Sequence, residues 1–304
     1  MTLEGILPVW KPAGFTSHDV VAKVRRILSI KRIGHTGTLD PQVTGVLPLC
    51  IGRATRMVEY IQELPKEYEA VLRIGLSTDT EDMTGTVLEE VSQVTLGESQ
   101  LRGVLESFLG DIEQIPPMFS AVKVDGKRLY ELAREGKEVE RKSRKATIYE
   151  LEILELNMDQ KHPEIRFRAV CSKGTYIRTL CVDIGRALGY PAVMVSLIRT
   201  STGNIRKEQC LTFEQIVQLK EDGSLQQHMI PMDIAISHMP SITLNDQEAL
   251  HSLQGKKIAL AANRVAHADA SQTIFRAYSP DERFLGLFEW KSTSQVLVPA
   301  KVFL

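Results

Sequence analysis

The 304-residue sequence lacks long hydrophobic runs and closely spaced cysteines. No apolar stretch approaches the roughly 18–20 residues that a membrane-spanning helix needs, so no membrane anchor is expected. The first residues have neither the basic nor the apolar part of a signal peptide. The four cysteines contain no CxxC pair, which disfavours a tetrahedral zinc site. We therefore predict reduced, mostly buried thiols in a cytoplasmic protein.

Net charge is almost absent, at a formal −1 at pH 7, so the total does not indicate a nucleic-acid-binding protein. The distribution is less even. Residues 79–113 hold nine acids and one base, whereas residues 121–145 hold nine bases and five acids. A basic face of the kind that binds a phosphate backbone is compatible with these counts. Charged helices that simply face solvent would give the same counts.

The composition, 43% hydrophobic and 25% charged, is that of a globular protein with enough apolar residues for a core. The length fits one large domain with a small one, or two medium domains. Strand patterns and helix patterns alternate without a strict βαβ repeat. We therefore predict an α+β domain with a largely antiparallel or mixed sheet.

Hydrophobic periodicity and turn residues place the expected elements. A helix is expected from an N-cap at Ser17 to Leu28. Further helices are predicted over 54–63, 98–109, 128–135 and 175–188, and strands over 5–9, 46–51, 66–76, 87–91, 114–124, 146–156, 164–171 and 192–198. After a connector at 229–240, we expect a small all-β module with one short helix at 246–253 and strands at 257–261, 265–269, 273–278, 284–290 and 296–303.

One polar loop stands out because it holds a single acid. The segment GHTGTLDP begins at Gly34 and contains Asp40, and the next acid along the chain is Glu59. Its glycines allow another segment to approach closely, and Pro41 restricts the backbone of Asp40. A lone carboxylate does not fit the paired acids of ordinary glycosidases. It fits a nucleophile or a solitary general base, and a side chain that only caps a turn is the alternative.

Three other features are candidates for a site. Tyr68 begins a strand and could stack on a planar ring or pack across the sheet. His35 could stack on a base or only hydrogen-bond within its loop. The segment 172–178 joins a strand to a helix, and such a helix N-terminus binds anions. Arg178 in that segment could form an ion pair with Asp40, or could remain a surface arginine.

The sequence of residues 34–56, GHTGTLDPxxxGVLPLxIGxATR, closely resembles the catalytic motif of the TruB-type tRNA pseudouridine synthases. Other motifs similar to those of that family follow in the same order: Lys66–Tyr68, Thr78–Thr80 with Gly85, 116–123 followed by GKxLY, Ser172–Arg178, and Ser196-Leu197-x-Arg199. The resemblance runs from residue 5 to residue 233. The C-terminal segment is only similar to the PUA-type RNA-binding domain.

The resemblance implies a pseudouridine synthase core with a mixed, bisected sheet flanked by helices in residues 1–236, and a PUA-like RNA-binding module in 237–304. It implies conversion of uridine to pseudouridine at position 55 in the tRNA T-loop, without cofactor or metal. Asp40 would be the nucleophile, attacking either C6 of uracil or C1′ of ribose. The substrate-binding residues would be His35 at the displaced nucleotide, Tyr68 on the flipped base, Arg178 beside Asp40, and Tyr176 and Leu197 around the uracil.

Binding of the tRNA T-arm would then use the basic segment. The residues expected to follow its phosphates are Lys123, Lys127, Arg128, Arg141, Lys142, Arg144 and Lys145. No obligate protein partner is expected. A tRNA-binding folding factor with secondary catalysis is the alternative from another class. A synthase within a guide-RNA complex is disfavoured, because the chain lacks long basic tails.

Overall fold

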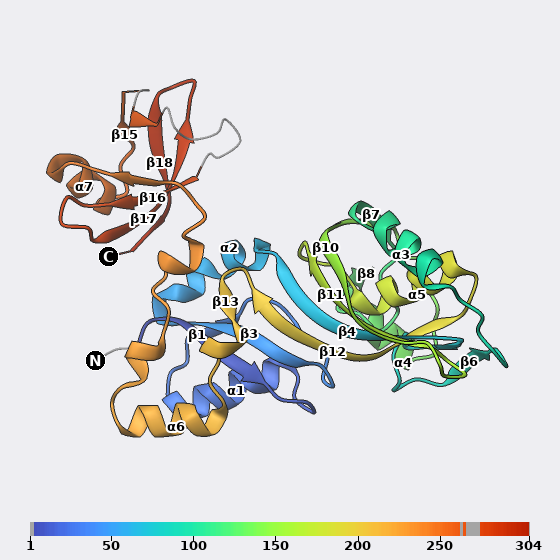
Figure 1. Ribbon diagram of the computed structural model, residues 1–304. Helices are drawn as coiled ribbons and strands as arrows, with labels where there is room; N and C mark the ends of the chain where they lie inside the picture. The colour runs from blue at the N-terminus through green and yellow to red at the C-terminus, as the bar shows by residue number, and fades with distance from the viewer. Residues whose placement is uncertain (1–2, 262–263, 266–273, 304) are drawn as a thin grey trace.

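The computed structural model describes residues 3–261, 264–265 and 274–303. Its larger sheet has nine strands, and the main path runs β1–β3–β12–β4–β11–β10–β7, with β2 paired to β3 and β13 to β12 (Figure 1). These strands are β1 (Gly5–Lys11), β2 (Ile33–His35), β3 (Thr44–Ile51), β4 (Lys66–Ile74), β7 (Gly110–Gln114), β10 (Arg144–Asn157), β11 (Glu164–Cys171), β12 (Ala192–Thr202) and β13 (Ile205–Arg206).

The sheet is divided into two halves. Its strand pairs are antiparallel, except that β12 and β3 run parallel and share a register of only two residue pairs, Ile198–Thr44 and Arg199–Gly45. This short junction joins the β1–β3 half to the half built on β12 and β4. The predicted α+β fold with a mixed, bisected sheet is confirmed.

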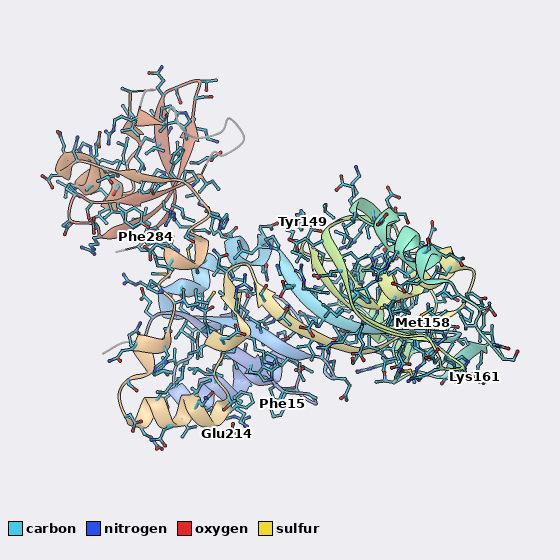
Figure 2. All side chains as sticks on the ribbon, in the orientation of Figure 1. Phe15, Tyr149, Met158, Lys161, Glu214 and Phe284 are labelled. Atoms are coloured by element: carbon cyan, nitrogen blue, oxygen red, sulfur yellow. The ribbon has the colours of Figure 1, made fainter. Side chains whose placement is uncertain are left out.

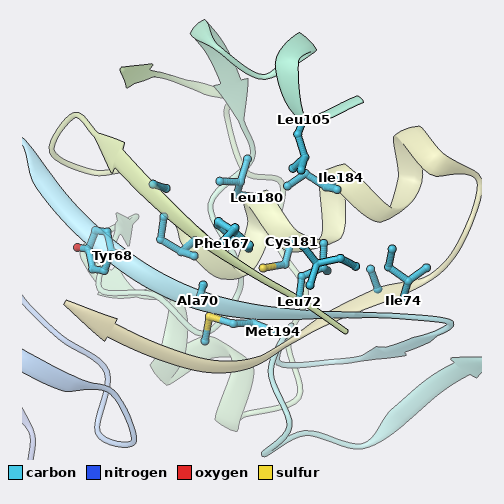
Figure 3. Close-up of a cluster of buried hydrophobic side chains, with 14 of the residues drawn as sticks. Tyr68, Ala70, Leu72, Ile74, Leu105, Phe167, Leu180, Cys181, Ile184 and Met194 are labelled. Carbon is cyan, nitrogen blue, oxygen red and sulfur yellow. The ribbon is translucent and has the colours of Figure 1, made fainter. Parts of the chain in front are cut away.

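Helices cover one face of the β4 half. Alternate residues of β4 are buried, because successive side chains of a strand point to opposite faces. Figure 3 shows Ala70 and Leu72 of β4 and Phe167 of β11 beneath side chains of α5 (Ile177–Leu188). Helix α3 (Glu98–Ser107) adds Leu105 to the same cluster.

The β1–β3 half carries α1 (Ser17–Leu28) and α6 (Phe213–Glu221), whose apolar residues pack with those of the two strands. A second apolar cluster of this half involves a 3₁₀ segment (Gly52–Met57) that continues into α2 (Val58–Glu63). The helix predicted over 54–63 is therefore 3₁₀ over 54–57 and α-helical over 58–63. Sequence periodicity did not indicate α6.

The predicted N-cap of α1 is wrong by one residue. Thr16, not Ser17, has extended backbone at φ −74° and ψ 160°. Its hydroxyl accepts from the Asp19 amide at 3.0 Å, and the Asp19 carboxylate accepts from the Thr16 amide at 2.9 Å. The Ser17 hydroxyl is instead buried against Leu39. Thr16 and Asp19 therefore form a reciprocal capping box.

Two small hairpins extend from the sheet: β5 (Leu76–Thr78) with β6 (Val87–Glu90), and β8 (Lys123–Val124) with β9 (Lys127–Arg128), which leads into α4 (Leu129–Arg134). The strand predicted over 114–124 is wrong. Strand β7 ends at Gln114, and the segment with Pro116 and Pro117 has no regular structure before β8. Proline has no amide hydrogen to donate to a neighbouring strand. The strand predicted over 66–76 is interrupted at Gly75.

The C-terminal residues form a separate five-stranded sheet in the order β14–β16–β17–β18–β15. Its elements are β14 (Ser241–Thr243), α7 (Asp246–Leu253), β15 (Ile258–Ala259), β16 (Ile274–Tyr278), β17 (Phe284–Lys291) and β18 (Val296–Val302), after 3₁₀ turns at Lys207–Gln209, Leu225–His228 and Ile234–Ile236. Helix α7 confirms its prediction. The strand expected over 265–269 falls almost wholly outside the described residues.

Side chains of this module pack against the β1–β3 half. Leu287 and Phe303 belong to the same apolar cluster as Met57 and Ile61, and Phe284 lies at the junction (Figure 2). Lys301 pairs with Glu59 at 2.7 Å.

Replacing Thr16 with Ala should destabilise the protein by about 1 kcal/mol, because the first turn of α1 loses its side-chain acceptor. Urea unfolding followed by circular dichroism would measure this loss. The variant Thr16→Ser retains the hydroxyl and should lose much less. Equal stability of Thr16→Ala and the unmodified protein would contradict the capping assignment.

Candidate active site

Asp40 lies in the loop between β2 and β3, directly before the junction of the two half-sheets. Leu39 and Val43, on either side of it, are buried in the same apolar cluster as Tyr68. The side chain of Asp40 nevertheless remains 42% exposed. Apolar residues thus fix the loop to the core while its carboxylate remains accessible.

Arg178 is the counter-ion of that carboxylate. Its Nη2 lies 2.9 Å from Asp40 Oδ2, and its own side chain is only 6% exposed. Nη2 also donates to the carbonyl of Phe119 at 2.8 Å, and Nη1 donates to the carbonyl of Thr80 at 2.9 Å. The guanidinium therefore connects three loops. The ion pair considered from the sequence is present in the structure.

Lys11 fixes the Asp40 loop by hydrogen bonds to its backbone carbonyls. This fully buried residue donates from Nζ to the carbonyls of Pro12 and Pro41 at 3.0 Å and of Val43 at 2.6 Å. Burial lowers the pKa of its ammonium from 10.5 to about 8, although the negative charge of Asp40 acts in the opposite direction. Sequence reasoning gave Lys11 no role. A charge at the end of an apolar strand was the available signal.

Arg199 fixes the other end of the loop. It is 1% exposed, and its Nε donates to the Val46 carbonyl at 2.7 Å while Nη2 reaches the Gly37 carbonyl at 3.4 Å. Its backbone runs so close to Gly45 that a Cβ there would lie 2.2 Å from the Arg199 carbonyl oxygen, and Gly45 has a φ of +128°. Both facts require glycine at position 45. Sequence reasoning gave Arg199 no role.

The three other predicted base-binding residues, Tyr68, Leu197 and Tyr176, come from three different elements. Tyr68, in β4, is 9% exposed and stands at one end of the apolar cluster (Figure 3). Burial raises the pKa of its hydroxyl. Leu197 packs against the same cluster from β12. Tyr176 caps α5, and its backbone amide and carbonyl bond the side chain of Gln114 at 2.9 and 3.1 Å.

His35 ends β2 and is half-buried. The Gly37 amide donates to its Nδ1 at 3.4 Å. Burial, and secondarily the nearby His18, lower the pKa of its imidazole. His35 is therefore a neutral ring at pH 7.

The basic segment is only partly free to meet RNA. Lys127 pairs with Glu135 at 3.1 Å, Arg128 donates to the Tyr130 hydroxyl at 3.1 Å, and Arg141 donates to the Pro116 carbonyl at 3.1 Å. The other four, Lys123, Lys142, Arg144 and Lys145, are exposed and form no ion pair with described residues. The structure therefore separates three internally engaged bases from four available ones.

Within residues 3–261, 264–265 and 274–303, no helix is long and apolar enough to cross a membrane. In the same described part of the chain, no three or more His, Cys, Asp and Glu side chains are grouped as metal ligands.

Solved structures share this architecture. A chain from a crystal structure of a Cbf5–Nop10–Gar1 complex superposes with a TM-score of 0.77 at 30% identity, covering 99% of this chain and 85% of the other. A chain from an H/ACA RNP bound to a substrate RNA containing 2′-deoxyuridine gives 0.75 at 26% identity, covering 99% and 85%. The bisected sheet and its likeness to these chains identify an enzyme of the pseudouridine synthase class.

Sequence comparisons identify the family. The model of the TruB family pseudouridylate synthase N-terminal domain matches residues 25–177, and that of the tRNA pseudouridylate synthase B C-terminal domain matches residues 178–237. The tRNA pseudouridine synthase B of Staphylococcus aureus (strain MSSA476) is 50% identical over 305 aligned residues, 99% of each chain. That of Bacillus pumilus (strain SAFR-032) is 44% identical over 303, 99% and 97% of the two chains.

The chain therefore belongs to the TruB family of pseudouridylate synthases. It is an isomerase that converts uridine to pseudouridine in tRNA. The family and enzyme class predicted from the sequence are confirmed.

The free energies of unfolding of Lys11→Met and of the unmodified protein should differ by an amount that depends on pH. The folded pKa of about 8 lies below 10.5, so between these values the unfolded chain binds more protons than the folded one. The stability contribution of Lys11 therefore rises with pH, by at most about 1.4 kcal/mol per unit. Urea unfolding of both proteins from pH 7.5 to 10 measures it, and other titrating groups cancel in the difference. A difference that is constant over this range would contradict the assignment.

Proposed function

We propose that this chain modifies the uridine at position 55 in the T-loop of tRNA, with Asp40 as the nucleophile. The observation that carries the proposal is the accessible Asp40 carboxylate paired at 2.9 Å with the buried Arg178. A carboxylate nucleophile must be charged and positioned, and a fixed guanidinium favours both. Neighbouring apolar and aromatic side chains provide the planar surroundings that a uracil needs.

The reaction conserves the atoms of the nucleoside apart from proton exchange. Asp40 adds to C6 of the uracil or to C1′ of the ribose, and the bond between N1 and C1′ breaks. The base turns, a bond forms between C5 and C1′, the carboxylate leaves, and the proton on C5 passes to solvent while N1 gains one. Both routes need the same carboxylate, so the proposal does not depend on the choice.

The other site residues bind the base. A nucleotide within a folded loop must be extruded first, at a cost of a few kcal/mol. Stacking on Tyr68 would recover about 1–3 kcal/mol, and Tyr176 and Leu197 line the uracil pocket. His35 faces the position that the extruded nucleotide vacates. Arg178 remains the counter-ion of Asp40 throughout.

The remaining proposed contacts are to parts of the tRNA outside the target nucleotide. The T-arm backbone follows the basic segment, chiefly through its four exposed and unpaired residues. Residues 237–304 act as a PUA-like RNA-binding domain attached to the catalytic domain of residues 1–236. The enzyme acts on tRNA in the cytoplasm without an obligate protein partner. High identity to tRNA pseudouridine synthases B over nearly the whole chain supports this assignment over a guide-RNA complex.

Asp40→Asn should lose tritium release from a T-arm RNA that carries [5-³H]uridine at position 55, by a factor on the order of 10³ or more, because the amide is a poor nucleophile. Asp159→Asn, at an exposed position remote in sequence, is the control and should remain active. The Asp40 variant should still bind the RNA. Full activity of Asp40→Asn would exclude it as the nucleophile, whereas no release by the unmodified protein would exclude position 55.

Replacing Lys142, Arg144 and Lys145 together with Ala should weaken T-arm binding and flatten its salt dependence. Each lost phosphate contact lowers the slope of log K against log salt by about 0.7–0.9. Fluorescence anisotropy from 50 to 300 mM KCl measures this slope. Lys127→Ala is the matched comparison, and it should cost less because Glu135 already binds that ammonium. An unchanged slope in the triple variant would remove these residues from the RNA interface.

A further inference from the structure

The beginning of α1 forms one wall of the Asp40 loop. The Leu39 amide donates to Ser17 Oγ at 2.9 Å, and the Gly14 amide donates to the Pro41 carbonyl at 2.9 Å. These two bonds fix the residues on either side of Asp40. Residues 14–18 therefore lie next to the segment 39–41 that carries the Asp40 carboxylate.

The next residue of α1 is His18, whose imidazole ring also lies beside this loop. Its imidazole meets that of His35 edge-to-face, with centroids 5.3 Å apart and planes at 75°. His18 is exposed, and its ring has no hydrogen bond or ion pair with any residue that the structure describes. Such a pair uses the edge of one ring and the face of the other, so an aromatic surface remains open to solvent.

His18 is not needed to hold His35 in place. His35 is already held in place, because it ends β2 and accepts from the Gly37 amide. Burial is the main cause of its lowered pKa, and the neighbouring His18 and Arg199 act in the same direction. The neutral ring of His35 and the exposed ring of His18 thus form an aromatic pair at the edge of the candidate active site. Flat rings of this kind bind nucleobases by stacking with little dependence on sequence.

We propose that His18 is a further substrate-contacting residue, whose ring stacks on the nucleobase adjacent to the extruded uridine. This inference rests on the proposed function, in which His35 faces the position that the extruded nucleotide vacates. Together the two histidines hold the RNA open: His35 faces the gap, and His18 supports the neighbouring base. The contact stabilises the extruded state, so its loss slows the reaction more than it weakens initial binding.

The test compares His18→Ala, His18→Phe and His18→Gln on a T-arm RNA that carries [5-³H]uridine at position 55, under single-turnover conditions. We expect His18→Ala and His18→Gln to react about tenfold more slowly, with little change in Kd, and His18→Phe to remain within about threefold of the unmodified protein. A second RNA with 2-aminopurine next to the target should show reduced quenching with His18→Ala. His228→Ala, an exposed histidine in a 3₁₀ turn, is the control and should change neither readout.

A nuclear magnetic resonance titration of His35 shows whether the rings interact in the free protein. The pKa of His35 should rise in His18→Ala, because the neighbouring ring that lowers it is removed. An unchanged pKa would overturn the contact. Unchanged kinetics in His18→Ala would overturn the substrate role, as would rescue by His18→Gln but not by His18→Phe. A failure of the unmodified protein to release tritium would reject position 55 itself, so the two failures are distinguishable.

Discussion

The junction of the two half-sheets and the Asp40 loop depend on the hydrogen bonds of the buried Arg199 guanidinium. The two halves of the sheet share only two residue pairs there, and Arg199 stands in one of them opposite Gly45. Its side chain crosses to the carbonyls of Val46 and Gly37 on the other side. A buried charge is costly unless hydrogen bonds satisfy it. The backbone of the Asp40 loop supplies those bonds, so the loop and the junction stabilise each other.

The distribution of charge around this junction supports the proposed role of Asp40 as the reactive carboxylate. Lys11 and Arg199 direct their donors mainly at backbone carbonyls. They therefore fix the loop without forming ion pairs with Asp40. Among the residues that the structure describes, Arg178 alone pairs with Asp40, and it also donates to carbonyls of two further loops. One oxygen of the carboxylate is thus held by Arg178, while 42% of the side chain remains exposed.

Local patterns predicted much of the fold. The alternation in β4, the helix α7 and the hairpin of β10 with β11 follow from side-chain periodicity and turn residues. The predictions that were wrong concern segments whose conformation depends on contacts with residues distant in the sequence. The segment after Gln114 has an apolar sequence, but arginine contacts to its carbonyls replace strand pairing. At α1, the choice between Thr16 and Ser17 depends on Leu39, whose amide uses the Ser17 hydroxyl.

By itself, the sequence determined the family, the isolated acid Asp40 and the candidates that surround it, because these belong to contiguous motifs with a fixed order. Only the tertiary structure decided what holds that acid. Two of the three carbonyl partners of Lys11 lie 30 and 32 residues away, and the two of Arg199 lie 153 and 162 residues away. The ring of His18 meets His35 only because α1 packs against the loop. Such contacts depend on how segments distant in the chain are brought together, and local periodicity carries no information about them.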